Sequence, residues 1–162
     1  MFQKSDIASL SLQFDPEEIP GLTKRYGPKQ DDAALAAGHR IDDGEYTRKN
    51  LGEIFEWKTK GRGRSRLLRN TDREIADALA LVVKAQTERA AIAVLTGLHG
   101  VNVPVASAIL TAIDPDRYTV IDFRALAALG SKTQNRSIDF YLDYLCRLPP
   151  ARQKTPRDVA RP

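Results

Sequence analysis

Apolar residues recur along most of the chain at the three- and four-residue spacing of an amphipathic helix. No stretch alternates cleanly between apolar and polar residues over the length of a strand. We therefore predict an all-α fold, a compact bundle of several helices. The pattern places helices over residues 16–26, 29–38, 46–57, 74–85, 88–99, 104–113, 122–129 and 138–148.

Signals at the helix ends support this assignment. Thr71 and Glu74 form a capping-box pair, in which each side chain can satisfy a free backbone N–H at the helix start. Thr87 can cap the next helix. Gly38 and Gly130 stand where helices are expected to stop. The helices over 74–85 and 88–99 are apolar on nearly every side, which predicts that they are buried.

The chain has 162 residues, the size of one domain. We predict a single helical domain over residues 1–148. Residues 149–162 carry four prolines and four positive charges, and we expect them to be a disordered basic tail.

Composition excludes several classes of protein. With one cysteine, Cys146, and two histidines, the chain cannot build a disulfide framework or an iron–sulfur cluster. Zinc sites of four cysteines, or of two cysteines and two histidines, are excluded too. We expect neither a metal nor another cofactor. No apolar run approaches the roughly 18 residues of a membrane span, and no secretory signal is evident, so we expect a cytoplasmic protein without a membrane partner.

Charge is distributed unevenly along the chain, whose net charge is +4. Residues 1–57 carry seven basic and eleven acidic side chains, whereas residues 58–162 carry eighteen and ten. The asymmetry fits a protein that faces a polyanion, and equally a surface whose charge is merely uneven.

The segment 58–69 has six positive charges, two glycines and no acid, and is predicted to be a loop leading into a short helix. Its cations can neutralise phosphates, although a solvated basic loop is the alternative. Trp57, just before it, could stack on a base, but we expect it in the core.

The sequence of residues 98–110 predicts two helices joined by a tight turn. The turn is built on Gly100, Val101 and Asn102, and Pro104 lies in the first turn of the second helix, where proline is tolerated. Gly100 and Asn102 are the residues best able to take a positive φ. Such a turn can direct backbone N–H groups outward at a helix N-terminus, which is a phosphate-binding geometry.

This segment resembles the helix-hairpin-helix of the DNA glycosylase superfamily, which includes endonuclease III and the adenine, 8-oxoguanine and alkylation-repair glycosylases. The family's hairpin reads L-P-G-V-G-x-K-x-A. The resemblance covers residues 71–130, and the matching positions are Leu98, Gly100, Val101, Ala106, Ile109 and Leu110. Asp122 follows Pro104 by 18 residues and falls where the family has its catalytic aspartate.

Two departures from the family pattern bear on activity. Asn102 replaces the second hairpin glycine, and Pro104 stands at the position of the lysine that forms a Schiff base in bifunctional members. The resemblance therefore implies a monofunctional glycosylase that hydrolyses an N-glycosidic bond in DNA without a lysine Schiff base. The alternative is a non-catalytic helix-hairpin-helix module that only binds DNA. A third interpretation is a structural or protein-interaction domain, with the hairpin as a tight connection.

Asp122 has two possible roles, which are compatible with each other. It can stabilise the cationic sugar as the base leaves, as the resemblance implies, or it can cap the helix that begins at Phe123. Arg124 can contact phosphate or remain a solvated helix residue. The predicted catalytic residue is thus Asp122, and the predicted DNA-binding residues are Gly100, Val101, Asn102, Lys58, Lys60, Arg62, Arg64, Arg66 and Arg124.

Overall fold

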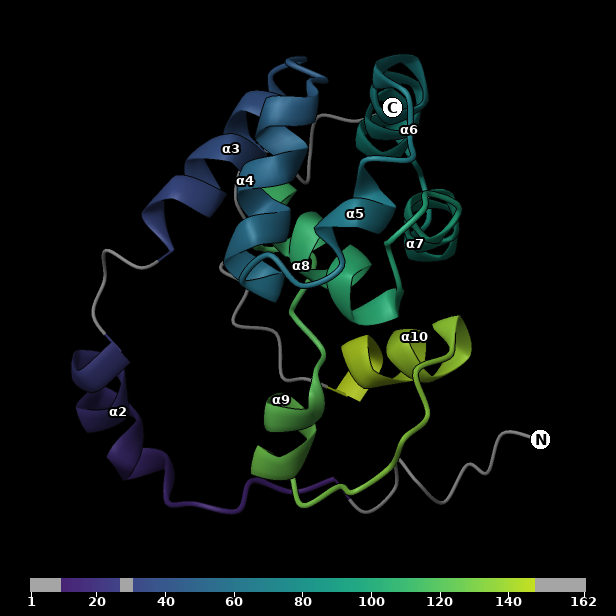
Figure 1. Ribbon diagram of the computed structural model, residues 1–162. Helices are drawn as coiled ribbons and strands as arrows, with labels where there is room; N and C mark the ends of the chain where they lie inside the picture. Colours follow the sequence, from purple (N-terminus) through teal and green to yellow (C-terminus); the bar gives the residue numbers. More distant parts are fainter. Residues whose placement is uncertain (1–9, 27–30, 148–162) are drawn as a thin grey trace.

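The computed structural model describes residues 10–26 and 31–147, and these residues form helices and no strand (Figure 1). The all-α prediction is confirmed for them. The tail expected at 149–162 lies outside the described residues, as does the start of the helix predicted over 29–38. The elements are η1 (Pro16–Glu18), α2 (Ile19–Tyr26), α3 (Asp32–Asp42), α4 (Arg48–Thr59), α5 (Arg64–Leu67), α6 (Asp72–Lys84), α7 (Glu88–Thr96), α8 (Val103–Ile113), α9 (Phe123–Ala128) and α10 (Ile138–Arg147).

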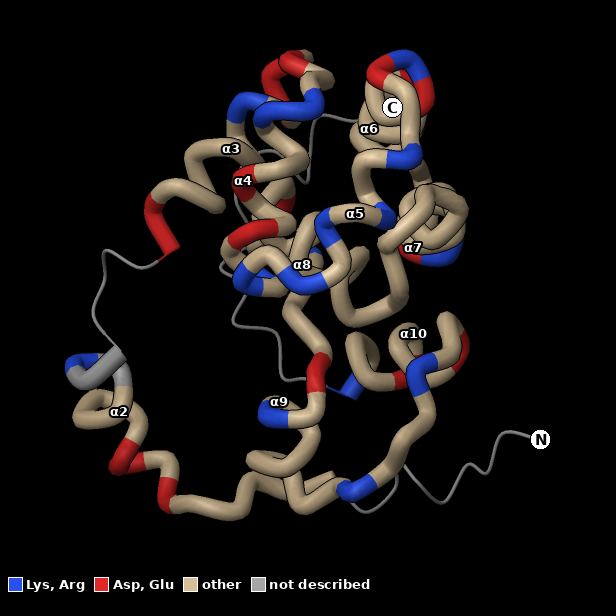
Figure 2. Tube along the Cα trace, in the orientation of Figure 1, with Lys and Arg blue, Asp and Glu red and all other residues tan. Residues whose placement is uncertain are grey.

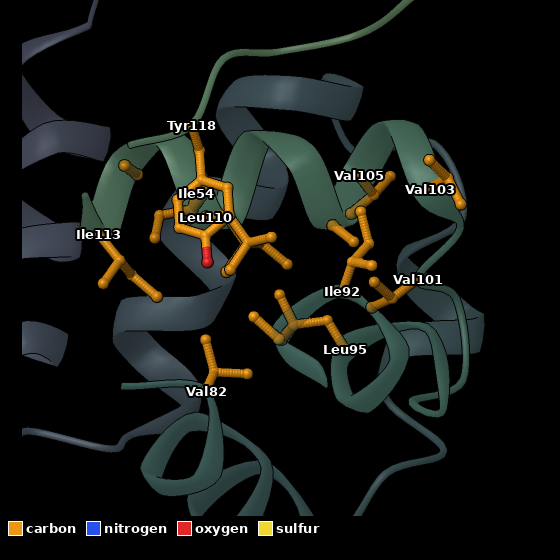
Figure 3. Close-up of a cluster of buried hydrophobic side chains, with 14 of the residues drawn as sticks. Ile54, Val82, Ile92, Leu95, Val101, Val103, Val105, Leu110, Ile113 and Tyr118 are labelled. Atoms are coloured by element: carbon orange, nitrogen blue, oxygen red, sulfur yellow. The ribbon is translucent and has the colours of Figure 1, made fainter. Parts of the chain in front are cut away.

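Helix α8 lies at the centre of the bundle and contacts α3, α4 and α7 (Figure 1). Nine of its eleven residues are buried, because its sequence is apolar or small on every side. Figure 3 shows Ile92 and Leu95 of α7 beneath the side chains of α8, with Val105 close to Ile92. The hairpin's second helix is therefore the core of the fold.

Helices α6 and α7 differ from the prediction that they are buried on nearly every side. Each buries one face only, and Leu81 on α6 is 58% exposed. The prediction was wrong because α8 already fills the centre, which leaves α6 and α7 at the edge of the bundle. A helix can then keep apolar residues on its solvent side without being enclosed.

Gly38 does not end a helix, as the sequence predicted, but lies inside α3. A Cβ atom built at this position would come within 1.8 Å of the Ala112 carbonyl oxygen. The glycine therefore allows the backbones of α3 and α8 to touch. Its role is close packing between helices, and that role depends on a partner far along the chain.

The predicted helix caps are present. Thr71 and Glu74 form both hydrogen bonds of the capping box at α6, and Thr87 Oγ1 accepts a hydrogen bond from the Ala90 N–H. Gly130 takes a φ of +76° just after α9, as expected of a residue that stops a helix. In the part of the chain that the structure describes, no helix has both the length and the apolar composition to cross a membrane.

Candidate nucleic-acid interface and carboxylate site

The hairpin turn packs directly against the end of the basic segment 58–69. Gly100 has a φ of +81°, and a Cβ atom there would lie 2.9 Å from the Leu67 backbone nitrogen and 3.2 Å from Arg66 Cβ. Only glycine fits both the backbone angle and the space. The fold thus brings together two elements that the sequence had singled out separately for binding phosphate.

A buried asparagine fixes this contact. Asn70, which is nearly inaccessible to solvent, donates hydrogen bonds from Nδ2 to the carbonyl oxygens of Leu67 and His99 and accepts one at Oδ1 from the His99 N–H. It therefore joins the end of α5 to the residue just before Gly100. Asn70 was not predicted from the sequence, because nothing local distinguishes a buried asparagine from a solvated one.

Asn102 does not take the left-handed conformation that its place in the turn suggested. Its φ is −95°, and its Oδ1 accepts a hydrogen bond from the Val105 N–H, so it is the N-cap of α8. Val103 is the first helical residue and has no acceptor for its N–H within the helix. Asn102 is exposed, whereas the Val101 side chain is buried. The turn can therefore offer a phosphate the helix end at Asn102 and Val103, but not the side chain of Val101.

The basic segment has five exposed cations, of which Arg69 is the last. We call the other four the basic face: Lys60, Arg62, Arg64 and Arg66. Figure 2 shows blue Lys and Arg positions along α5 and the loop that joins it to α4, in front of α8. The predicted loop and short helix are confirmed, although Lys58 still belongs to α4. Between α4 and α5 the backbone φ is positive at three residues, Lys60, Gly61 and Gly63. These left-handed residues lie between α4 and α5, and Arg66 of α5 lies beside Gly100.

Lys58 behaves differently from the other predicted DNA contacts. Its Nζ donates a 2.6 Å hydrogen bond to Asp122 Oδ2, and its side chain is 13% exposed. Asp122 is 28% exposed, and its Oδ1 accepts hydrogen bonds from the N–H groups of Arg124 and Ala125. The cap interpretation of Asp122 is therefore confirmed. The ion pair, which joins residues on α4 and before α9, was not predicted.

These contacts keep Asp122 charged. Partial burial by itself raises the pKa of the carboxyl, but the hydrogen bond from Lys58, the Ala125 N–H and the positive charge of Lys58 outweigh it. The net pKa lies below the ordinary value of an aspartate. The site can thus present an ionised carboxylate at neutral pH.

Three hydroxyl groups hold the chain just before Asp122. Ser107 Oγ, buried on α8, accepts a hydrogen bond from the Ile121 N–H and donates one to the Pro104 carbonyl. From α10, the Tyr141 hydroxyl donates to the carbonyl of residue 119 and the Tyr144 hydroxyl to that of residue 120. The sequence predicted packing for these tyrosines, and they also bond to the backbone. Asp122 is therefore positioned by the hairpin's second helix and by α10.

The carboxylate of Asp122 also affects the pKa of Tyr144. Burial raises the pKa of its phenol to about 12, and the negative charge of Asp122 contributes in the same direction. Burial likewise raises the pKa of Tyr141. Both hydroxyls therefore stay protonated at neutral pH and act as hydrogen-bond donors to the connection.

Arg124 lies exposed on α9, and its guanidinium carbon is 5.6 Å from the ring centroid of Phe123.

Trp57, which was expected in the core, is half-buried. It packs against the core, and its Nε1 donates a hydrogen bond to Asp31 Oδ1. Within residues 10–26 and 31–147, no group of three or more histidine, cysteine, aspartate and glutamate side chains could hold a metal ion.

Comparison with known proteins gives no match: no protein-family model, curated protein or solved structure is significantly similar to this chain. Function has to be inferred from the chain's own residues.

Proposed function

We propose that the protein binds DNA and hydrolyses an N-glycosidic bond in it, with Asp122 as the catalytic carboxylate. The observation that best supports the proposal is the state of Asp122, an ionised and partly exposed side chain whose position is fixed by the hairpin's second helix. The resemblance of residues 71–130 to the DNA glycosylase superfamily supports it from the sequence, because Asp122 matches the family's catalytic aspartate.

The proposed chemistry needs a negative charge and little else from the protein. The bond between the base nitrogen and C1′ of the sugar breaks, and its electron pair leaves with the base, which takes up a proton. The sugar becomes a cationic, oxocarbenium-like species that the Asp122 carboxylate stabilises. Water then adds to C1′ and loses a proton to solvent, which leaves an abasic sugar.

The ion pair with Lys58 sets a condition on this chemistry. An ammonium in contact with the carboxylate keeps it ionised, but also neutralises part of the charge that the sugar needs. We infer that Lys58 gives up part of this contact when DNA is bound. Phosphates arriving at the basic face offer the ammonium an alternative acceptor.

Pro104 has no amine that could form a Schiff base with the sugar. The abasic product is therefore expected to stay intact.

The second candidate is a DNA-binding module without catalysis, and the same ion pair favours it. Both carboxylate oxygens of Asp122 already have partners: Oδ1 binds two backbone N–H groups, and Oδ2 binds Lys58. This is a complete structural role for the residue. In that case the protein would use the basic face and the helix end at Asn102, and release no base.

Two measurements separate the candidates. Mobility shifts with duplex DNA at two salt concentrations test binding, which should weaken steeply as salt rises if phosphates dominate. Base release from a panel of duplexes carrying different damaged bases then tests catalysis. Binding without release supports the DNA-binding module. Absence of binding contradicts both candidates and favours a structural or protein-interaction domain.

A further inference from the structure

Phe123 is the most exposed large apolar side chain in the described part of the chain. It is 66% exposed, compared with 60% for Leu68 and 58% for Leu81. It is the first residue of α9 and directly follows Asp122. The ring does not contribute to the core, and it lies on the surface next to the candidate carboxylate in sequence.

The ring is paired with a cation. The guanidinium carbon of Arg124 lies 5.6 Å from its centroid, within the range of a cation–π contact. Aromatic rings and guanidinium planes are the two surfaces on which proteins stack unpaired nucleobases. Phe123 and Arg124 offer both, next to each other in sequence and in space.

The surrounding charges favour a nucleic acid as the ligand. Asp122, the neighbour of Phe123, is in contact with Lys58, and Lys58 precedes the first cation of the basic face by two residues. A strand whose phosphates lie on the basic face would therefore bring its bases close to α9. A base paired within a duplex is stacked on both sides, so only an unpaired base has a face free for the ring.

We propose that Phe123 and Arg124 form a stacking site for an unpaired base of DNA. The inference rests on the proposed DNA binding and is independent of catalysis by Asp122. A protein partner that covers Phe123 is the competing explanation, and it predicts that this residue has no effect on DNA binding.

The test compares three fluorescein-labelled DNAs of the same sequence: a paired duplex, the duplex with a one-nucleotide bulge, and the single strand. Dissociation constants are measured by fluorescence anisotropy for the wild type and for Phe123→Ala. Stacking on one base predicts that the variant binds the bulge and the single strand about 5- to 150-fold more weakly. Its affinity for the paired duplex should stay the same.

Matched variants identify the cause. Phe123→Trp keeps a flat ring and should retain the preference, and its added fluorescence should be quenched by the single strand. Phe123→Leu keeps an apolar side chain without a ring and should lose most of the preference. Leu81→Ala, at a similarly exposed position on α6, should change nothing. Melting temperatures confirm that each variant is folded.

The possible failures are distinguishable. If the wild type binds DNA but does not prefer an unpaired base, or if Phe123→Ala keeps that preference, the stacking site is wrong and the proposed DNA binding stands. If the wild type binds none of the three DNAs, both are wrong. If it binds and stacks as expected but releases no base, only the catalytic role of Asp122 is contradicted.

Discussion

Lys58 Nζ lies 2.6 Å from Asp122 Oδ2, so the end of α4 is tied to the start of α9 by an ion pair across 64 positions of sequence. The pair joins the basic segment to the carboxylate that the hairpin's second helix positions. It also explains why a partly buried aspartate has a lowered pKa.

Removing the ammonium should destabilise the fold. Lys58→Met keeps the length of the side chain and leaves Asp122 with its two backbone donors only. We expect the free energy of unfolding to fall by about 1.5 to 3 kcal/mol, as for a hydrogen bond to a charged group. Denaturant titration at pH 7 measures it. Lys60→Met, at the exposed neighbouring lysine, is the control and should cost less.

The same pair predicts how stability depends on pH. Because the folded pKa of Asp122 lies below its unfolded value, its contribution is fully present above the unfolded pKa of about 3.9 and is lost as pH falls through the folded pKa. The difference in stability between wild type and Lys58→Met should therefore be constant at neutral pH and shrink below about pH 4. A difference that does not change between pH 7 and pH 3 would show that the pair does not hold the carboxylate charged.

Gly38→Ala should be severely destabilising, because its Cβ would collide with the backbone of Ala112. We expect a loss of about 3 kcal/mol or more, at the upper end for overpacked cores. Gly52→Ala is the matched control, since nothing lies within 4 Å of a Cβ there and the position is also helical. It should be stabilising by up to about 1 kcal/mol. Equal thermal unfolding of the two variants would mean that α3 and α8 are not in contact at Gly38.

Local signals in the sequence were sufficient for most of the fold. Helix periodicity and the caps at Thr71 and Thr87 predicted elements that the structure contains. These features depend on neighbours a few residues away. Gly38 was assigned to a helix end because a glycine inside a helix can be explained only by its partner, Ala112, which is distant in sequence.

The candidate site was predictable only in part, for the same reason. The turn at Gly100 and the cap at Asp122 follow from local residue types. The contact of Lys58 with Asp122 and that of Asn70 with His99 depend on how helices pack. Local patterns therefore identified the elements of the site, but not how they are connected.

Asn102 allows the helix end to be tested without disturbing the fold. Asn102→Asp keeps a good N-cap and adds a negative charge at the place where a phosphate would lie. We expect about a 5-fold weaker affinity for duplex DNA, from a repulsion of about 1 kcal/mol. Asn102→Ser also keeps the cap but adds no charge, and its affinity should match the wild type. If Asn102→Asp and Asn102→Ser bind duplex DNA with equal affinity, the phosphate does not lie at this helix end.

The basic face should make a separate electrostatic contribution. Replacing Arg62, Arg64 and Arg66 with glutamine should flatten the plot of log K against log salt concentration by up to ~2.7, if each contacts one phosphate. Fluorescence anisotropy at several salt concentrations measures the slope. Replacing Arg73 and Lys84 on α6, also exposed, is the control and should leave the slope unchanged. An unchanged slope in the triple variant would mean that this face does not touch DNA.

The most direct test of the account is base release by wild type and Asp122→Asn on the same damaged duplexes, with melting temperature and DNA affinity measured on the same samples. The asparagine keeps the shape of the side chain and part of the cap, but loses the charge. If Asp122 is catalytic, the wild type releases base and leaves an abasic site, while the variant loses activity on the order of 10² to 10³-fold and still binds DNA. If Asp122 is only a cap and the partner of Lys58, the variant melts at a lower temperature and releases base at the wild-type rate, and that result would contradict the account.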